Sequence, residues 1–181
     1  MALSPEIVRR LDPGRRRDPV GRSVPYPLRV DQPDVVVAAL HVAKARRLPT
    51  RSVERVEIVA AWGIVGDRYE GSKHRQVSIQ SQDALREAEA IFGAPIDPGL
   101  TRRNITISSG VVPRDPGSQI RIGDALLEVV RVAAPCKLLD DTIGPDAQVA
   151  LRRRGGSICR VLESGTVTVG DVVQLPVETS A

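Results

Sequence analysis

The segment RVAAPCKLLDD, residues 131–141, places one cysteine between a proline and a lysine, directly after an apolar run. Pro135 interrupts the preceding strand, so we expect Cys136 at a strand end or in a loop. The charge of Lys137 favours the thiolate, which is a soft metal ligand and can carry sulfur. The alternative is a buried, inert thiol, the commonest state of a free cysteine. Cys159 lies in an apolar alternation and fits that alternative.

A second group of candidate residues lies in LTRRNITI, residues 100–107, where two arginines and an asparagine lead into a β-branched run. An arginine fork can bind two oxygens of a phosphate or carboxylate, and an asparagine amide adds a donor and an acceptor. Because strand residues alternate between faces, we expect Arg102 and Asn104 to point together and Arg103 to point the other way. The alternative is a charged strand end without a ligand.

The glycine-rich segment GIVGDRYEG, residues 63–71, requires a tight turn. It matches neither the dinucleotide-binding pattern nor a phosphate loop with Gly-Lys-Ser/Thr, and we interpret Asp67 as bonding to its own backbone. In KHRQVSI, residues 73–79, His74 and Arg75 begin the next strand. Beside the glycine loop they could hold an anion. Taken alone, a solvated strand end explains them better.

Composition limits the classes of function. The chain has 181 residues, two cysteines and two histidines, too few for a disulfide framework or a structural zinc site. The net charge of +4 permits nucleic-acid binding, but the aromatic faces that stack on single strands are scarce. No apolar run reaches the ~20 residues of a membrane helix, and the first residues lack a signal-peptide core. We therefore expect a cytoplasmic protein with reduced thiols, no membrane contact and no nucleic-acid partner.

Hydrophobic patterns predict the secondary structure. Residues 1–33, rich in Pro and Arg, are expected to be an extension, and residues 34–178 a single domain. Helices are predicted at 82–93, capped by Ser81, and at 144–156, ended by two glycines. Gly-Asp turns predict strand pairs in 119–133 and 166–177. Further strands are predicted at 35–43, 51–60, 75–81, 104–108 and 157–165. These elements predict a mainly β fold, barrel-like and mostly antiparallel, with two helical insertions.

The order of the segments GIVGDRYEG, RQVSI, RRNITI, RIGDALLEV, APCK and RRGGSICRVLESGTVTVGD resembles the MOSC domain, named for the C-terminal region of molybdenum cofactor sulfurases. The resemblance covers residues 35 to about 177. It implies that Cys136 ligates molybdenum or carries sulfur as a persulfide, and that an Arg-x-Asn segment, here Arg102 and Asn104, binds the phosphate end of molybdopterin. The charge and position of Arg103, Arg75 and Lys137 add them to the expected cofactor-binding residues.

Some members of the family reduce N-hydroxylated compounds, and that activity on a small-molecule substrate is our leading hypothesis. Tyr69 stands where the family often has histidine, so the role of that position is open. Neither a desulfurase domain nor an electron-transfer domain is recognisable, so a separate electron-transfer or sulfur-donor protein is expected as partner. The other hypotheses are a sulfur carrier without metal and an anion- or nucleic-acid-binding module that uses the arginine-rich extension.

Overall fold

The computed structural model describes residues 15–17, 23–25 and 34–176. The chain divides into two units, residues 1–33 and residues 34–181. In the first unit, β1 (Arg15–Arg17) pairs antiparallel with β2 (Ser23–Pro25). The rest of the predicted extension lies outside the described residues.

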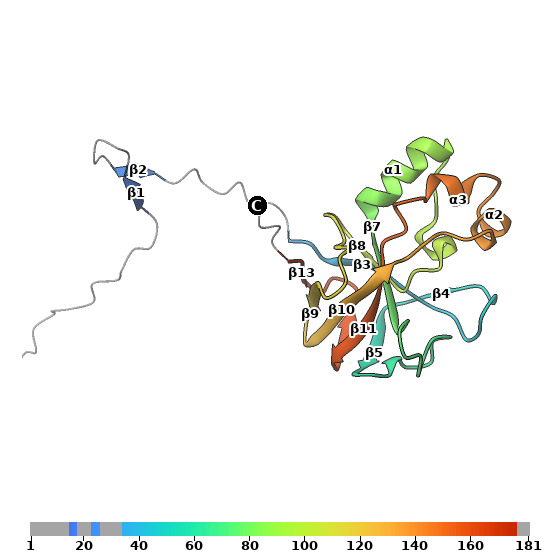
Figure 1. The fold of residues 1–181 in the computed structure, drawn as a ribbon, viewed down its shortest axis with the longest axis horizontal. Coiled ribbons are helices and arrows are strands. Elements are labelled where there is room, and N and C mark those ends of the chain that lie inside the picture. The colour runs from blue at the N-terminus through green and yellow to red at the C-terminus, as the bar shows by residue number, and fades with distance from the viewer. Residues whose placement is uncertain (1–14, 18–22, 26–33, 177–181) are drawn as a thin grey trace, which may run out of the picture. The chain divides into compact units, whose positions relative to one another are not determined.

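The second unit is mainly β, as the sequence predicts (Figure 1). Its larger sheet has eight strands, and each neighbouring pair is antiparallel except β7 with β8. In order across the sheet the strands are β13 (Val173–Gln174), β9 (Gln119–Ile122), β10 (Ala125–Val132), β11 (Ser157–Glu163), β7 (Val77–Ser81), β8 (Ile105–Ile107), β3 (Val37–Val42) and β4 (Arg51–Val53). The sheet is therefore mostly antiparallel, as predicted, with one parallel pair.

The larger sheet curls back toward itself. An isolated antiparallel bridge joins Val36, next to β3, to Val172, next to β13. The backbone N–H of Val37 donates to the carbonyl of Asp171 at 2.9 Å, and that of Val173 donates to the carbonyl of Val35 at 2.7 Å. These bonds bring distant strands of the sheet together, which gives the barrel-like shape predicted from the sequence.

A smaller sheet contains three strands, β12 (Gly165–Thr168), β5 (Arg55–Val59) and β6 (Gly63–Ile64), in that order. The predicted strand pair within 166–177 is therefore wrong, because β12 pairs with β5 whereas β13 pairs with β9. A turn does form at Gly170, but the chain after it bonds to the residues before β3 instead of folding back on β12. The other predicted pair, β9 with β10, is confirmed.

The helix α1 (Gln82–Phe92) is confirmed with both of its predicted ends. The Ser81 hydroxyl accepts from the backbone N–H of Ala84 at 3.2 Å, and Gly93 ends the helix with a positive φ of 82°. The second predicted helix is much shorter, α3 (Ala147–Ala150), because Asp146 before it and Arg153 after it are left-handed. Sequence patterns missed α2 (Leu138–Thr142), which is only one turn long, and the 3₁₀ helix η1 (Pro98–Thr101).

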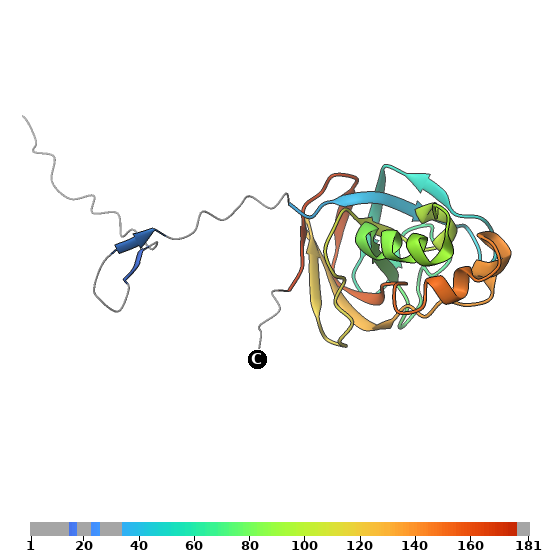
Figure 2. The same ribbon diagram turned by 90° about the horizontal axis from the view of Figure 1, so that it is seen from above.

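The helices gather on one side of the strands, where α1 lies across them (Figure 2). A small apolar cluster that includes Leu85, Leu139 and Leu151 joins α1, α2 and the end of α3. Within the described residues, no helix is both long and apolar enough to span a membrane.

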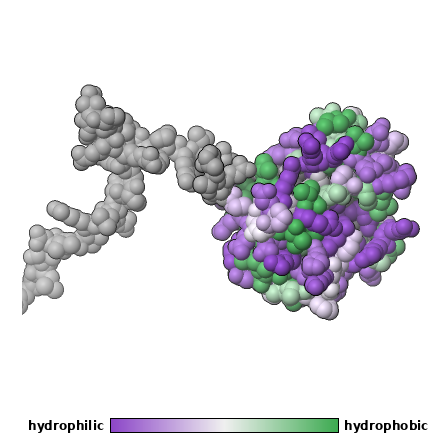
Figure 3. Space-filling view, viewed as in Figure 1, coloured by the Kyte–Doolittle hydropathy of each residue, from purple (hydrophilic) through white to green (hydrophobic). Residues whose placement is uncertain are grey.

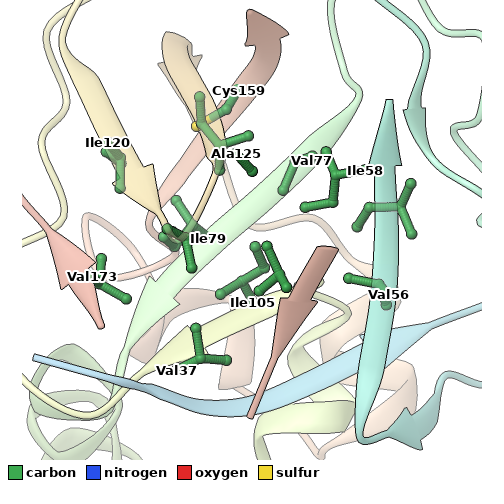
Figure 4. Packing of buried hydrophobic residues seen from close by; sticks show 14 of the residues in the cluster. Val37, Val56, Ile58, Val77, Ile79, Ile105, Ile120, Ala125, Cys159 and Val173 are labelled. Atoms are coloured by element: carbon green, nitrogen blue, oxygen red, sulfur yellow. The ribbon is translucent and has the colours of Figure 1, made fainter. Parts of the chain in front are cut away.

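The main core lies between the two sheets and is built almost entirely of aliphatic side chains (Figure 4). Ile79, Ile105 and Ile120 are completely buried there. Cys159, on β11, packs in the same cluster with no exposed surface. The face of the molecule seen in Figure 3 is mostly hydrophilic, with separate apolar patches.

Candidate functional site

A cavity of about 240 Å³, here called the Cys136 pocket, brings the only exposed cysteine of the described residues together with five arginines. None of its described lining residues carries a carboxylate, so the pocket is strongly positive and suited to anions. Its lining residues are Cys136, Arg46, Arg47, Arg75, Arg102, Arg103, Tyr69, Thr101, Ala134, Leu138 and Leu139.

Cys136 owes its exposure to the end of a strand. β10 stops at Val132, and Pro135 stands between the strand and the cysteine. The carbonyl of Cys136 then accepts from the N–H of Leu139 at 2.9 Å, so the chain turns directly into α2. This is the strand-end position that the sequence predicts. Cys159, by contrast, is buried in the core, where burial raises the pKa of its thiol to about 12.

Arg103 links the segment before Cys136 to the glycine turn at Gly155 through hydrogen bonds. Its Nε donates to the carbonyl of Gly155 at 2.7 Å, and its Nη2 donates to the carbonyl of Ala133 at 3.1 Å. Burial, and next the charge of Arg75, lowers the pKa of Arg103 to about 10, so it remains a cation at neutral pH. Because three backbone carbonyls occupy its donors, the third being that of Thr101, Arg103 mainly positions the pocket wall.

Two glycines allow that wall to pack closely. A Cβ on Gly155 would overlap the carbonyl oxygen of Ala133, and a Cβ on Gly156 would overlap the carbonyl oxygen of Ile79. Gly156 also has a φ of +74°, which favours glycine. From the sequence we predicted only that these glycines end a helix. The structure shows that they also allow close backbone contact with Ala133 and Ile79.

Arg102 reaches the pocket from a left-handed backbone with a φ of 64°. Its Nη1 donates to the carbonyl of Leu48 at 2.7 Å, and its own carbonyl accepts from Nη2 of Arg68 at 2.6 Å. Burial, and then the charge of Arg68, lowers the pKa of Arg102. A non-glycine residue in this region costs free energy, and such strain is frequent at functional sites.

Asn104 does not line the pocket with Arg102, so the predicted geometry of this pair is wrong. The prediction assumed strand alternation, but β8 begins only at Ile105 and Arg102 is left-handed. The Asn104 amide is buried and engaged within the protein. Its Oδ1 accepts from the N–H and the hydroxyl of Ser78 at 3.1 and 2.7 Å, and its Nδ2 donates to the carbonyl of His41 at 3.2 Å. Asn104 thus joins the strands beneath the pocket.

Tyr69, whose role the sequence analysis left open, also lines the pocket and lies beside three arginines. The guanidinium carbons of Arg75, Arg68 and Arg46 lie 4.2, 5.0 and 5.8 Å from the centre of its ring, within the range of cation–π attraction. Burial is the main cause that lowers the pKa of Arg75. Its Nε is buried without a hydrogen-bond partner among the described residues. Arg75 is therefore held by stacking, with donors free for a ligand.

The glycine loop holds Tyr69 in place through Asp67. The buried Asp67 carboxylate accepts from the N–H of Ala43 at 3.0 Å and from the N–H of Tyr69 at 3.1 Å, and it pairs with Arg68 at 3.3 Å. Asp67 is thus a structural residue, as the sequence indicates. The basic side chains of Arg46 and Arg47 were missed, because an exposed KARRLP segment gives no periodic signal.

Besides Asn104, two predicted residues lie outside the pocket lining. Lys137 is 82% exposed and its Nζ is 3.6 Å from a carboxylate oxygen of Asp141. His74 is also exposed, although its neighbour Arg75 lines the pocket. Of the predicted cofactor-binding residues, the structure brings Arg75, Arg102 and Arg103 to the pocket of Cys136.

Comparison with known domain families matches residues 66–174 to the MOSC domain. The fold is similar to the crystal structure of YuaD protein from Bacillus subtilis, with a TM-score of 0.69, 22% identity, and 78% of this chain and 94% of that chain covered. It is also similar to YiiM from Geobacillus stearothermophilus (TM-score 0.63, 19% identity, 78% and 75% covered) and YiiM from Escherichia coli (TM-score 0.60, 18% identity, 82% and 73% covered). No curated protein sequence matches the chain significantly.

Proposed function

The chain belongs to the MOSC domain family, and from this premise we propose that it binds the molybdenum cofactor, with Cys136 as a ligand of the metal, and reduces N-hydroxylated compounds. One observation supports the proposal most strongly: an exposed thiol lines a pocket with five arginines and no described carboxylate. A thiolate suits a soft metal, and guanidinium groups suit the phosphate of the pterin.

The residues of the pocket fit such a group. Arg75 offers a buried Nε without a partner in the described structure, directed by its stacking on Tyr69. Arg47 and Arg102 line both the Cys136 pocket and an adjoining hollow of about 170 Å³. Arg47 and Arg102 therefore place positive charge where the two hollows meet. We propose that Arg47, Arg75 and Arg102 hold the phosphate end, and that Cys136 faces the metal.

When bound, molybdenum supplies two-electron reduction chemistry. The overall reaction converts an N-hydroxylated amine, two electrons and two protons into the amine and water. We propose that a separate electron-transfer protein provides the electrons, and that the reaction takes place in the cytoplasm. The arginines of the pocket hold anionic charge beside the thiol, and Arg103 keeps the Cys136 segment against Gly155 so that the thiol stays accessible.

Metal content tests this proposal. The full chain is produced in cells that make the cofactor, and molybdenum and pterin are measured per protein for wild type, Cys136→Ala and Arg75→Gln. We expect Cys136→Ala to lose most of the molybdenum and Arg75→Gln to lose pterin and molybdenum together. The matched controls are Cys159→Ala and Arg55→Gln, which changes an exposed arginine outside the pocket lining. Wild type without molybdenum, or equal content in Cys136→Ala, would contradict the proposal.

The exposure of Cys136 also supports a second candidate, a sulfur carrier. An exposed thiolate can attack the outer sulfur of a donor persulfide, which leaves a persulfide on Cys136 and a thiol on the donor. Mass spectrometry of the peptide that contains Cys136 tests this candidate. A labile extra sulfur on that peptide, removed by a reductant and absent from the peptide of Cys159, is the result expected for a carrier. A peptide without extra sulfur after incubation with a persulfide donor argues against it.

A further inference from the structure

An open apolar groove of about 470 Å³ adjoins the Cys136 pocket. It is called the Val149 groove here, and its lining residues are Val132, Ala134, Pro135, Gln148, Val149, Arg152 and Arg153. Ala134 lines the groove and the Cys136 pocket alike, so the two hollows meet at the segment that carries the thiol. A molecule whose reacting group lies at Cys136 therefore has this groove directly beside it.

The floor of the groove exposes aliphatic surface that no described side chain covers. Val149 is 62% exposed and Val132 is 40% exposed, whereas core valines such as Val129 are 1% exposed. Val149 projects from α3, and Val132 ends β10. Contact with an apolar ligand would remove this surface from water, which is favourable.

The rim of the groove is cationic. Arg152 and Arg153 are both exposed, and no described residue forms an ion pair or hydrogen bond with either guanidinium group. Arg153 is held in a left-handed backbone with a φ of 65°. Gln148 adds an amide whose Nε2 lies 3.5 Å from the carbonyl of Pro135. Two free guanidinium groups beside aliphatic surface complement a ligand that is apolar and carries an anionic group.

We infer that the Val149 groove binds the non-reacting part of the substrate, and that it selects aryl or alkyl compounds that carry a carboxylate. This inference rests on the proposed function for the chemistry at Cys136, but the groove itself can be tested without metal. Three features support it: the continuity of the two hollows at Ala134, the exposed aliphatic floor, and the two arginines without partners among the described residues.

Reaction of the metal-free protein with dithiobis(nitrobenzoate), an aromatic disulfide with carboxylates, probes the groove. The Cys136 thiolate attacks one sulfur, a mixed disulfide forms, and one thionitrobenzoate is released and measured by absorbance. Neutral dithiodipyridine undergoes the same exchange without a carboxylate and serves as the matched reagent. We expect the rate with the carboxylated reagent to saturate with concentration, because binding in the groove precedes reaction.

Two variants locate this binding. Val149→Gln and Arg152→Gln change exposed side chains of the groove and leave the Cys136 pocket lining intact. We expect each to raise the half-saturating concentration of the carboxylated reagent roughly five- to tenfold, the equivalent of about 1 kcal/mol. Arg152→Gln should leave the neutral reagent unaffected. The matched controls are Val111→Gln, at a valine that is 71% exposed, and Arg55→Gln, and both should behave as wild type.

The outcomes separate this inference from the proposed function. The inference is overturned if the rate in wild type does not saturate. It is also overturned if the half-saturating concentration is equal in the groove variants and the controls, whatever the metal content. If an acidic protein occupies the groove instead, both reagents react equally with all variants, and only reduction by the electron donor weakens in Arg152→Gln. That result also overturns it. In protein loaded with molybdenum, the inference predicts a higher KM for a carboxylated N-hydroxylated benzamidine in Val149→Gln, with unchanged molybdenum content.

Discussion

The two cysteines of this chain carry the same thiol group but differ in exposure and in surroundings. Cys136 is exposed beside arginines, and Cys159 is completely buried among aliphatic side chains (Figure 4). The backbone decides the difference. Cys159 lies within β11, paired with Val77 on one neighbour and Val129 on the other. Cys136 follows Pro135, after β10 has ended. The comparison shows that the accessibility of a free cysteine depends on whether it lies within a paired strand or after the strand has ended.

The largest expected difference is in thiol reactivity. In native protein at neutral pH we expect iodoacetamide to modify Cys136 readily, whereas Cys159 should react at least about 10³-fold more slowly, because its exposure requires opening of core strands. Mass spectrometry of the two cysteine peptides over time measures both rates. In denaturant the two rates should converge. Comparable native rates would mean that β11 does not protect Cys159 as the structure indicates.

A second difference is in the pH dependence of stability. Burial raises the pKa of Cys159 to about 12 from an ordinary 9.0. Between these values the folded protein keeps a proton that the unfolded chain has lost, so the free energy of unfolding falls as pH rises, by up to about 1.4 kcal/mol per pH unit. Below about pH 8 this contribution to stability is complete. Urea unfolding of wild type and Cys159→Ala between pH 8 and 10.5, conditions set by the ordinary thiol pKa, measures the slope.

In that experiment Cys159→Ala should lose the thiol-linked part of the slope, and Cys136→Ala should keep it. Apart from the two thiols, the groups that titrate in this range are common to all three proteins. The difference in slope between each variant and wild type therefore reports the thiol that was removed. A slope that both variants share with wild type would show that the Cys159 thiol does not titrate differently in the two states.

A third contrast sharpens the comparison at neutral pH. Cys159→Ser places a hydroxyl in an aliphatic core and should lower the free energy of unfolding by about 1–3 kcal/mol. Cys136→Ser changes an exposed side chain and should stay within about 0.5 kcal/mol of wild type. Urea unfolding followed by circular dichroism gives both values. The reverse order of the two effects would exchange the structural and functional roles assigned to the cysteines.

The smallest expected effect concerns Tyr69, which lines the same pocket as Cys136. Tyr69→Leu removes the ring on which Arg75 stacks and should weaken binding of inorganic phosphate to the metal-free protein about two- to fivefold, as expected for loss of ~0.5–1 kcal/mol. Tyr69→Phe keeps the ring and should bind phosphate as wild type does. Calorimetric titration measures both. If Tyr69→Phe is as weak as Tyr69→Leu, the hydroxyl and not the stacking orients Arg75.

Local signals in the sequence predicted much of the fold. Ser81 and Gly93 delimit α1 because a side-chain cap and a left-handed glycine act within a few residues. The turn at Gly123 correctly predicted the pairing of β9 with β10. The similar Gly-Asp turn at Gly170 misled, because the strand that follows it bonds to residues before β3, more than a hundred positions away. Local chemistry specifies a turn but not the partner of the strand that leaves it.

The candidate site was predicted in the same uneven way. Pro135 gave the position of Cys136 correctly, because proline acts on its immediate neighbours. The alternation rule failed for Asn104, because the backbone at Arg102 is left-handed and the strand had not yet begun. The role of Tyr69 stayed open because its effect depends on three arginines brought together by the fold. Whether the pocket residues bind a cofactor stays a prediction.

The central claim is that the Cys136 thiolate is a ligand of molybdenum, and X-ray absorption at the molybdenum edge tests it most directly. Wild type, Cys159→Ala and Cys136→Ser are loaded with the cofactor and compared at equal protein concentration. We predict the same sulfur shell in wild type and Cys159→Ala, and one sulfur fewer per molybdenum in whatever metal Cys136→Ser retains. An unchanged sulfur shell in Cys136→Ser, at full metal content, would contradict the account.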